Sequence, residues 1–216
     1  MKKIYLIALF CFVFVNAFMQ QDPEAKKILD QSSQTVKSFK GIQVNFKLTI
    51  EDRKEKTNSS SQGVIKIKGD KYWFQSAEDI VYFDGKTMWT VGLDIKEVTI
   101  TEPNMEDSDF LSNPAKIFTW YNRDFKYRYD GKTKVNGTEA YEIDLFPKNL
   151  EQPYSRIKVF ISTGDNLLLS LKSVGKDGID YSIQLSDYIT NKDFDDSVFT
   201  FDPSKYKKFE IVDMRL

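Results

Sequence analysis

The stretch of sequence that decides the fold is Ile42-Gln43-Val44-Asn45-Phe46-Lys47-Leu48-Thr49-Ile50-Glu51. Apolar and polar residues alternate along it, so that five apolar side chains share one face. A period of two is typical of a β-strand with one buried face and one solvated face. We therefore expect a strand here, in a sheet whose apolar side encloses the interior of the protein.

The same alternation returns along most of the chain after this strand. Further apolar-rich segments lie at 64–68, 72–74, 80–83, 87–91, 95–101, 125–129, 141–145, 157–161, 167–171 and 179–185. Asp84-Gly85 between two of them is a strong hairpin signal. We interpret the polar run 51–62 as a loop and the residues after Pro203 as a charged tail. The pattern predicts about ten or eleven antiparallel strands in one curved sheet, a mainly β fold without a domain boundary.

A single helix is expected before the first strand. Asp22 suits the N-cap and Pro23 the first helical position. The residues that recur at helical spacing are Ala25, Ile28, Leu29, Ser32, Val36 and Phe39. Gly41 is the expected end of the helix.

The alternation breaks between Glu102 and Trp120, where Pro103 and Pro114 punctuate the chain. Five apolar residues suggest two short helical turns with an apolar side: Phe110, Leu111, Ile117, Phe118 and Trp120. The first four are the expected lid residues. Such a piece among strands is suited to cover the mouth of a barrel that is open at one end. The alternative is a permanent plug of the core.

The N-terminus has the features of a secretory signal. Lys2 and Lys3 precede an apolar run from Ile4 to Val15, which is short for a membrane span, and Val15-Asn16-Ala17 fits the small-residue rule for cleavage. We expect a signal peptide at 1–17 and a mature domain at 18–216. The alternatives are a cut near Gln20 or Gln21, a lipoprotein leader acylated at Cys11, and a retained signal-anchor.

The composition excludes several kinds of chemistry. The chain has no histidine, and its one cysteine lies in the expected leader, so that His-based catalysis, thiol chemistry and the usual zinc ligands are not expected. The formal net charge is −1, and the sequence has no basic tract that would bind nucleic acid. The S-x-x-K match at Ser173 and the acidic run 191–202 are better interpreted as turns. We expect no enzyme and no cofactor, although a glycosidase-like pair of carboxylates stays open.

The aromatic and aliphatic residues exceed what a small core needs, which favours an apolar cavity. Plain packing is the alternative for any one of them, and a one-residue slip of register reverses the face. The residues expected to line the cavity are Ile42, Val44, Phe46, Leu48, Tyr72, Phe74, Tyr82, Tyr127, Tyr141 and Ile143.

Several motifs, taken in order, resemble the periplasmic outer-membrane lipoprotein carrier family, LolA. Residues 42–46 and 63–68 are similar to the first two strands of that family, and 113–118 lie where it has lid helices. Asp84-Gly85-Lys86-Thr87-Met88-Trp89 matches its D-G-K-x-[LM]-[WY] hairpin, and Phe199-Thr200-Phe201-Asp202-Pro203 is similar to its closing F-x-F-x-P strand.

The resemblance implies an unclosed β-barrel with a helical lid over a hydrophobic cavity. It implies a monomeric periplasmic carrier that binds acyl chains of lipidated proteins. An inner-membrane ABC exporter would load it and an outer-membrane acceptor would unload it. A lipid- or lipoprotein-sensing regulatory module of the same fold is the alternative. Some members carry an arginine after the lysine of the second strand that bonds to the lid, and this chain has Gly69 there.

The lid interpretation predicts the behaviour of a Phe118→Ala variant. In a permanent plug, this change should lower the free energy of unfolding by ~2–5 kcal/mol. In a lid it should alter retention of a lipidated protein more than stability, because lids come from weakly held parts of a structure. Thermal unfolding and cargo retention are measured together. A large loss of stability with unchanged retention would show that the segment belongs to the core.

Overall fold

A computed structural model describes residues 22–103 and 121–215 of the chain. The elements are α1 (Pro23–Ser38), β1 (Ile42–Asp52), β2 (Thr57–Lys68), β3 (Lys71–Gln75), β4 (Asp79–Phe83), β5 (Met88–Gly92), β6 (Glu97–Thr101), α2 (Tyr121–Asp124), β7 (Phe125–Val135), β8 (Thr138–Pro147), β9 (Tyr154–Ser162), β10 (Leu168–Gly175), β11 (Ile179–Ile189), two 3₁₀ turns (Asp196–Phe199 and Pro203–Tyr206) and β12 (Glu210–Asp213).

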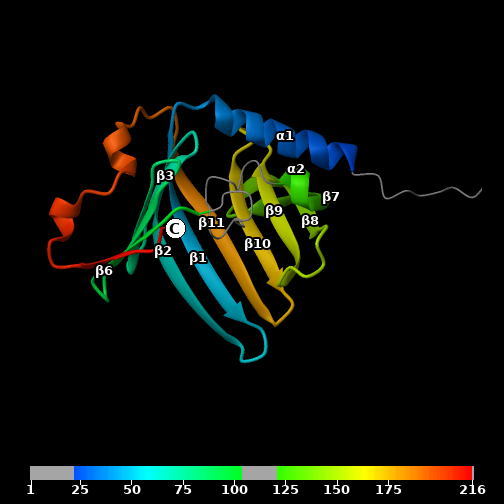
Figure 1. Cartoon of the computed structure of the whole chain (residues 1–216). Coiled ribbons are helices and arrows are strands. Elements are labelled where there is room, and N and C mark those ends of the chain that lie inside the picture. Colours follow the sequence, from blue (N-terminus) through cyan, green and yellow to red (C-terminus); the bar gives the residue numbers. More distant parts are fainter. Residues whose placement is uncertain (1–21, 104–120, 216) are drawn as a thin grey trace, which may run out of the picture.

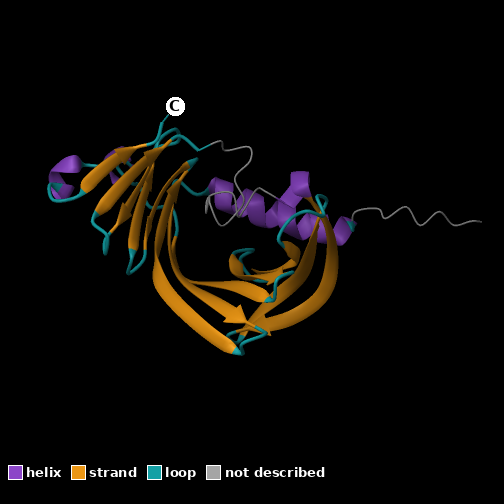
Figure 2. Ribbon diagram, turned by 60° about the horizontal axis from the view of Figure 1, so that its bottom comes forward, coloured by secondary structure: helices purple, strands orange, loops and turns teal. Residues whose placement is uncertain are grey.

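All twelve strands belong to one sheet, in the order β12-β6-β5-β4-β3-β2-β1-β11-β10-β9-β8-β7. Neighbours are antiparallel except β12 and β6, which run parallel. The sheet does not close, because β12 and β7 end it on either side. It curves into a trough, with α1 along the concave side (Figures 1 and 2). The predictions of a mainly β fold, an unclosed sheet and an N-terminal helix are confirmed.

The start of α1 is fixed by Asp22. One carboxylate oxygen accepts hydrogen bonds from the N–H groups of Glu24 (2.9 Å) and Ala25 (3.2 Å). The other accepts from the N–H of Tyr129 on the edge strand β7, at 2.9 Å. Asp22 therefore caps the helix and also ties it to the sheet.

Gly41 does not end the helix, contrary to expectation, since α1 stops at Ser38 with Phe39 as its C-cap. The glycine serves a close approach instead, because a Cβ there would lie 2.5 Å from the Lys192 carbonyl oxygen.

Three expectations for the strands are wrong. Most of the polar run 51–62 is strand, because Thr57–Gln62 pair in register with β1 despite having no apolar residue. The segment 199–203, which resembles a closing strand, holds parts of two 3₁₀ turns instead. The charged tail contains β12, which is why there are twelve strands rather than ten or eleven. Main-chain pairing decides these segments, and side-chain alternation does not report it.

Two apolar clusters lie on opposite faces of the sheet. The larger one fills the concave side beneath α1, where Ala25, Ile28 and Leu29 join the strands. The smaller one lies on the convex side of β4–β6, around Val91 and Val98, and the segment 201–209 packs against it. Its aromatic members include Tyr82, Trp89, Phe201, Tyr206 and Phe209.

We predict that Asp22→Ala lowers the free energy of unfolding by about 1–2 kcal/mol, the usual cost of losing an N-cap. Burial raises the pKa of Asp22, but the N–H groups of Tyr129, Ala25 and Glu24 together hold the pKa below its ordinary value of 3.8. The contribution should thus be complete above pH 3.8 and be lost as pH falls through the lowered pKa of the folded state.

Denaturant unfolding of both proteins between pH 7 and pH 2.5 measures this difference. Glu24→Ala is the matched control, because Glu24 is exposed in the same turn and its side chain makes no bond in the structure's described residues. An equal effect of the two substitutions would contradict the double role of Asp22.

Candidate functional site

The concave face is built from cross-strand rows of side chains. Residues paired across neighbouring strands lie on the same face, so the row can be followed from strand to strand. One row runs Ser61, Leu48, Ile183, Leu171, Val159, Ile143 and Tyr129. The next runs Ser59, Ile50, Tyr181, Ser173, Ile157, Leu145 and Tyr127. These rows give the trough a continuous, largely apolar floor.

Burial changes along the rows. Ile143, Ile157 and Leu171 are buried at the β8–β10 end. Leu48 and Ile183, on β1 and β11, are only partly buried against the same core. The apolar floor is therefore accessible at the β1–β11 end, which makes this end the candidate binding surface.

An aromatic stack borders the accessible end. The rings of Phe46 and Phe74 are stacked, with centroids 4.9 Å apart. Gly63 lies opposite Phe46, and a Cβ there would be 2.5 Å from the ring and 1.9 Å from the carbonyl oxygen of Gln75. The absence of a side chain at position 63 thus lets the Phe46 ring and β3 approach β2 closely.

A pocket of about 510 Å³ opens at this end, lined by Asn45, Phe46, Lys47, Gln62, Gly63, Val64, Asn136, Gln184, Leu185, Ser186 and Asp187. Asn136 belongs to the turn between β7 and β8, whereas the other residues come from β1, β2 and β11. β7 lies at the far end of the strand order from β2. The shared pocket shows that the sheet curls far enough to bring these parts together.

The structure brings together nine of the ten residues predicted to line a cavity. Ile42, Val44, Phe46, Tyr72, Tyr127 and Ile143 are buried in the concave cluster, and Leu48, Phe74 and Tyr141 pack partly buried against it. Whether they enclose a cavity for a ligand stays a prediction. Ile183, Val81 and Met88 belong to the same surface but were missed. Only the strand register, which the sequence does not give, reveals them.

Tyr82 lies on the other face of the sheet. It pairs with Trp73, whereas Tyr72 pairs with Phe83, so the face alternates between the two pairs. The Tyr82 hydroxyl hydrogen-bonds with that of Tyr206 at 2.9 Å, and its ring packs edge-on against Phe201. This is the one-residue slip of register that reverses a strand's face. The predicted lid residues Phe110, Leu111, Ile117 and Phe118 lie outside the described residues.

Three tyrosines of the concave cluster, Tyr72, Tyr121 and Tyr188, have raised pKa values and are uncharged at neutral pH. Burial raises the pKa of Tyr72 to about 12. Burial also raises the pKa of Tyr188, whose hydroxyl donates to the Leu168 carbonyl oxygen at 2.7 Å. Burial and the hydrogen bond to Asp30 raise the pKa of Tyr121. These phenols can donate hydrogen bonds but offer no base at neutral pH.

The two sequence stretches that match catalytic or metal-binding motifs are structural. Ser173 is buried on the concave face, while Lys176 lies in a turn and donates to the Leu150 carbonyl. In the acidic run, Asp195 and Asp202 cap the two 3₁₀ turns, and Asp196 forms ion pairs with Lys68 (2.8 Å) and Lys71 (2.6 Å).

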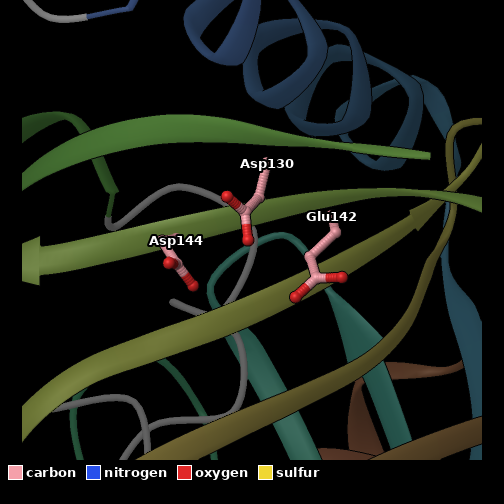
Figure 3. Close-up of side chains that lie close together, drawn as sticks. All are labelled: Asp130, Glu142 and Asp144. Carbon is pink, nitrogen blue, oxygen red and sulfur yellow. The ribbon is translucent and has the colours of Figure 1, made fainter. Parts of the chain in front are cut away.

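Three carboxylates lie within 4.8 Å of one another on β7 and β8: Asp130, Glu142 and Asp144 (Figure 3). The Lys158 ammonium contacts Glu142 and lies 3.5 Å from Asp144 Oδ1 and 3.9 Å from Asp130 Oδ2. Asp144, fully buried, also pairs through Oδ2 with Arg128 (3.0 Å) and Arg156 (3.1 Å). Three basic groups thus balance three acidic ones, and the ammonium takes the place that a metal cation would need.

Comparison with known proteins bears on the family. A family model described as outer membrane lipoprotein carrier protein LolA matches residues 15–162. A comparison with curated proteins finds no match. Among residues 22–103 and 121–215, no helix has the length and apolar character that crossing a membrane requires.

The similarity to one solved structure, with a TM-score of 0.60, supports the fold. The chain is similar to an uncharacterized conserved protein from Thermus thermophilus, with 10% identity, coverage of 88% of this chain and 99% of that chain, and a TM-score of 0.60. It is also similar to a putative outer membrane lipoprotein-sorting protein domain from Vibrio parahaemolyticus, with 9% identity, 82% and 96% coverage and a TM-score of 0.47. LprF from Mycobacterium bovis gives 16% identity, 80% and 98% coverage and a TM-score of 0.47.

We predict that Lys158→Met lowers the free energy of unfolding by about 2–3 kcal/mol. The substitution leaves two basic groups against three carboxylates and removes the cation beside the buried Asp144 Oδ1, and an unbalanced charge at a buried site is costly. Lys134→Met is the control, because Lys134 lies exposed in β7 and makes no ion pair in the described part of the chain. Thermal unfolding measures both variants. Wild-type stability should be indifferent to added Ca²⁺ or Mg²⁺, and a clear stabilisation by either cation would contradict this account of the cluster.

Proposed function

Because the chain belongs to the outer membrane lipoprotein carrier protein LolA family, we propose that it binds the acyl chains of lipoproteins on its concave face and carries them through the periplasm, from the inner to the outer membrane. An inner-membrane ABC exporter is the proposed donor and an outer-membrane protein the proposed acceptor. The leader 1–17 is proposed to be removed on export, and N-terminal sequencing of the exported protein tests this.

The observation that carries the proposal is the partly buried apolar surface of Leu48 and Ile183 beside a fully buried core. A protein whose apolar residues served only its core would bury them, whereas a protein that binds apolar chains presents an accessible apolar surface inside its concave sheet. The uncharged phenols along the cluster suit the same ligand. No acid–base group of the described concave cluster suggests chemistry on it, so we propose a binder rather than an enzyme.

Partial cover also suits release. A buried CH₂ contributes ~0.8 kcal/mol, so one chain of roughly fifteen CH₂ groups would contribute about 12 kcal/mol and three chains about 36 kcal/mol if fully buried. Non-covalent affinities reach only ~20 kcal/mol. A surface that covers the chains in part keeps the affinity within a range from which cargo can leave.

Depletion of the protein followed by membrane fractionation separates the carrier from the sensing alternative. A carrier predicts that lipoproteins accumulate in the inner membrane. A lipid-sensing regulatory module predicts normal lipoprotein distribution with an altered envelope-stress response, and that result would replace the present proposal.

We predict that Leu48→Asp weakens binding of a dipalmitoylated lipopeptide at least tenfold. The charge removes an apolar contact worth about 1.5–3 kcal/mol and adds a group that the acyl chain cannot solvate. Binding is measured by fluorescence titration and folding by circular dichroism.

Thr49→Asp is the matched control, since position 49 is the next residue of β1 and faces the opposite side of the sheet. Binding should be within twofold of wild type. Equal losses in the two variants would show that the concave floor is not the binding surface.

A further inference from the structure

Within residues 22–103 and 121–215, the first half of β2 pairs with a strand on one side only. β2 pairs with β1 from Thr57 to Ile67, but β3 pairs only with Val64–Lys68. The backbone of Thr57–Gly63 therefore forms an open edge, although β2 lies between β1 and β3 in the sheet. The long β1–β2 hairpin carries this edge beyond the end of β3 (Figure 1).

The hairpin between β2 and β3 shows which groups the edge presents. A two-residue turn, Gly69-Asp70, joins Lys68 to Lys71, and such a flanking pair exchanges hydrogen bonds. The direction of the N–H and C=O groups alternates from residue to residue along a strand. Because Lys68 directs these groups toward β3, every even-numbered residue of β2 directs them away from β1. Asn58, Ser60 and Gln62 thus turn three N–H and three C=O groups outward, and all three residues are exposed.

This edge lacks the protection found at the two ends of the sheet. Proteins usually guard an edge with charges, proline, shortness or a covering element. β7 carries Lys132 and Lys134 and is tied to α1 through Asp22, while β12 has four residues, two of them acidic. Thr57–Gln62 has no charge and no proline. An unguarded edge of this length is suited to pairing with another strand.

The open edge adjoins the candidate binding surface. Ser59 pairs with Ile50 and Ser61 with Leu48. The open edge is thus the outer side of β2, and the accessible apolar floor begins on the adjacent strand β1. Gln62 and Gly63 of the edge also line the pocket that contains Phe46 and Leu185. A molecule with an apolar part and an extended polypeptide part could therefore contact both at once.

We infer that the edge Thr57–Gln62 binds, as an added β-strand, the extended peptide that joins the acyl chains of the cargo to its folded part. The inference rests on the proposed function and names a second contact for the same ligand. Main-chain hydrogen bonds do not depend on the peptide's side chains, so one edge serves cargoes of different sequence. At ~3.3 Å per residue, six edge residues match a peptide of about six residues.

The test uses two ligands and one informative substitution. The ligands are an S-dipalmitoylglyceryl cysteine amide and the same group followed by six uncharged residues. Wild type should bind the lipopeptide about tenfold more tightly than the lipidated cysteine, as one or two ordinary hydrogen bonds would give. Ser60→Pro removes one outward N–H and should abolish this preference while binding of the lipidated cysteine is unchanged. Proline is tolerated there because the lost N–H does not face β1.

Ser60→Ala is the matched control, because it removes the hydroxyl, keeps the N–H and should keep the tenfold preference. Asn58→Pro, nearer the hairpin turn, repeats the test if Ser60→Pro does not fold, and hydrogen exchange should show protection of the Asn58, Ser60 and Gln62 amides by the lipopeptide alone. Equal wild-type affinity for the two ligands would overturn the inference and leave the proposed function standing. Absence of binding to either ligand would overturn both. A wild-type dimer that Ser60→Pro converts to monomer would assign the edge to a second copy of the chain and would also overturn the inference.

Discussion

Pairing between β1 and β11 is the interaction on which the rest of the structure depends. It joins Gln43 to Ile189 and continues to Asp52 and Ile179, and so connects strands from the two ends of the described chain. Without it, β1–β6 with β12 and β7–β11 would be two separate sheets. Neither half could then form a trough. Such non-local pairing costs chain entropy, because a long loop must close before the stabilising contacts form. We therefore expect it to be the slow step in forming this fold.

Joining the halves in one register also decides the chemistry of the floor. The apolar residues of β1 meet those of β11 on one face, and the rows continue to β8 without a change of side. α1 lies against β7 at one end of these rows, whereas Leu48 and Ile183 toward the other end are only partly buried. Lipid binding and the open edge of β2 then concern one region, because β2 is the next strand across from β1.

The sequence predicted what depends on local pattern. The alternation at 42–50, the cap at Asp22 and the turn at Asp84-Gly85 all led to the right elements, because each is decided within a few residues. It did not predict the strand at 57–62, the side on which Tyr82 lies or the parallel strand β12. In each of these cases, the deciding partner is a distant strand or segment, whose register leaves no mark in the local pattern. The candidate site shares this limit, since its apolar members are recognisable but their accessibility depends on where α1 lies.

Gly63 separates the half of β2 that pairs with β3 from its open half, and the substitutions that the structure allows differ between Gly63 and the residues before it. A methyl group at this position would collide with the Gln75 carbonyl and with the ring of Phe46. Substitution is therefore restricted to glycine here for reasons of space, although the backbone is an ordinary extended strand. The residues before it meet no such restriction, and any small uncharged side chain suits them. Related sequences that keep this geometry should show an invariant glycine directly after a variable polar run, a signature that an alignment would reveal where a single sequence shows only a loop-like stretch.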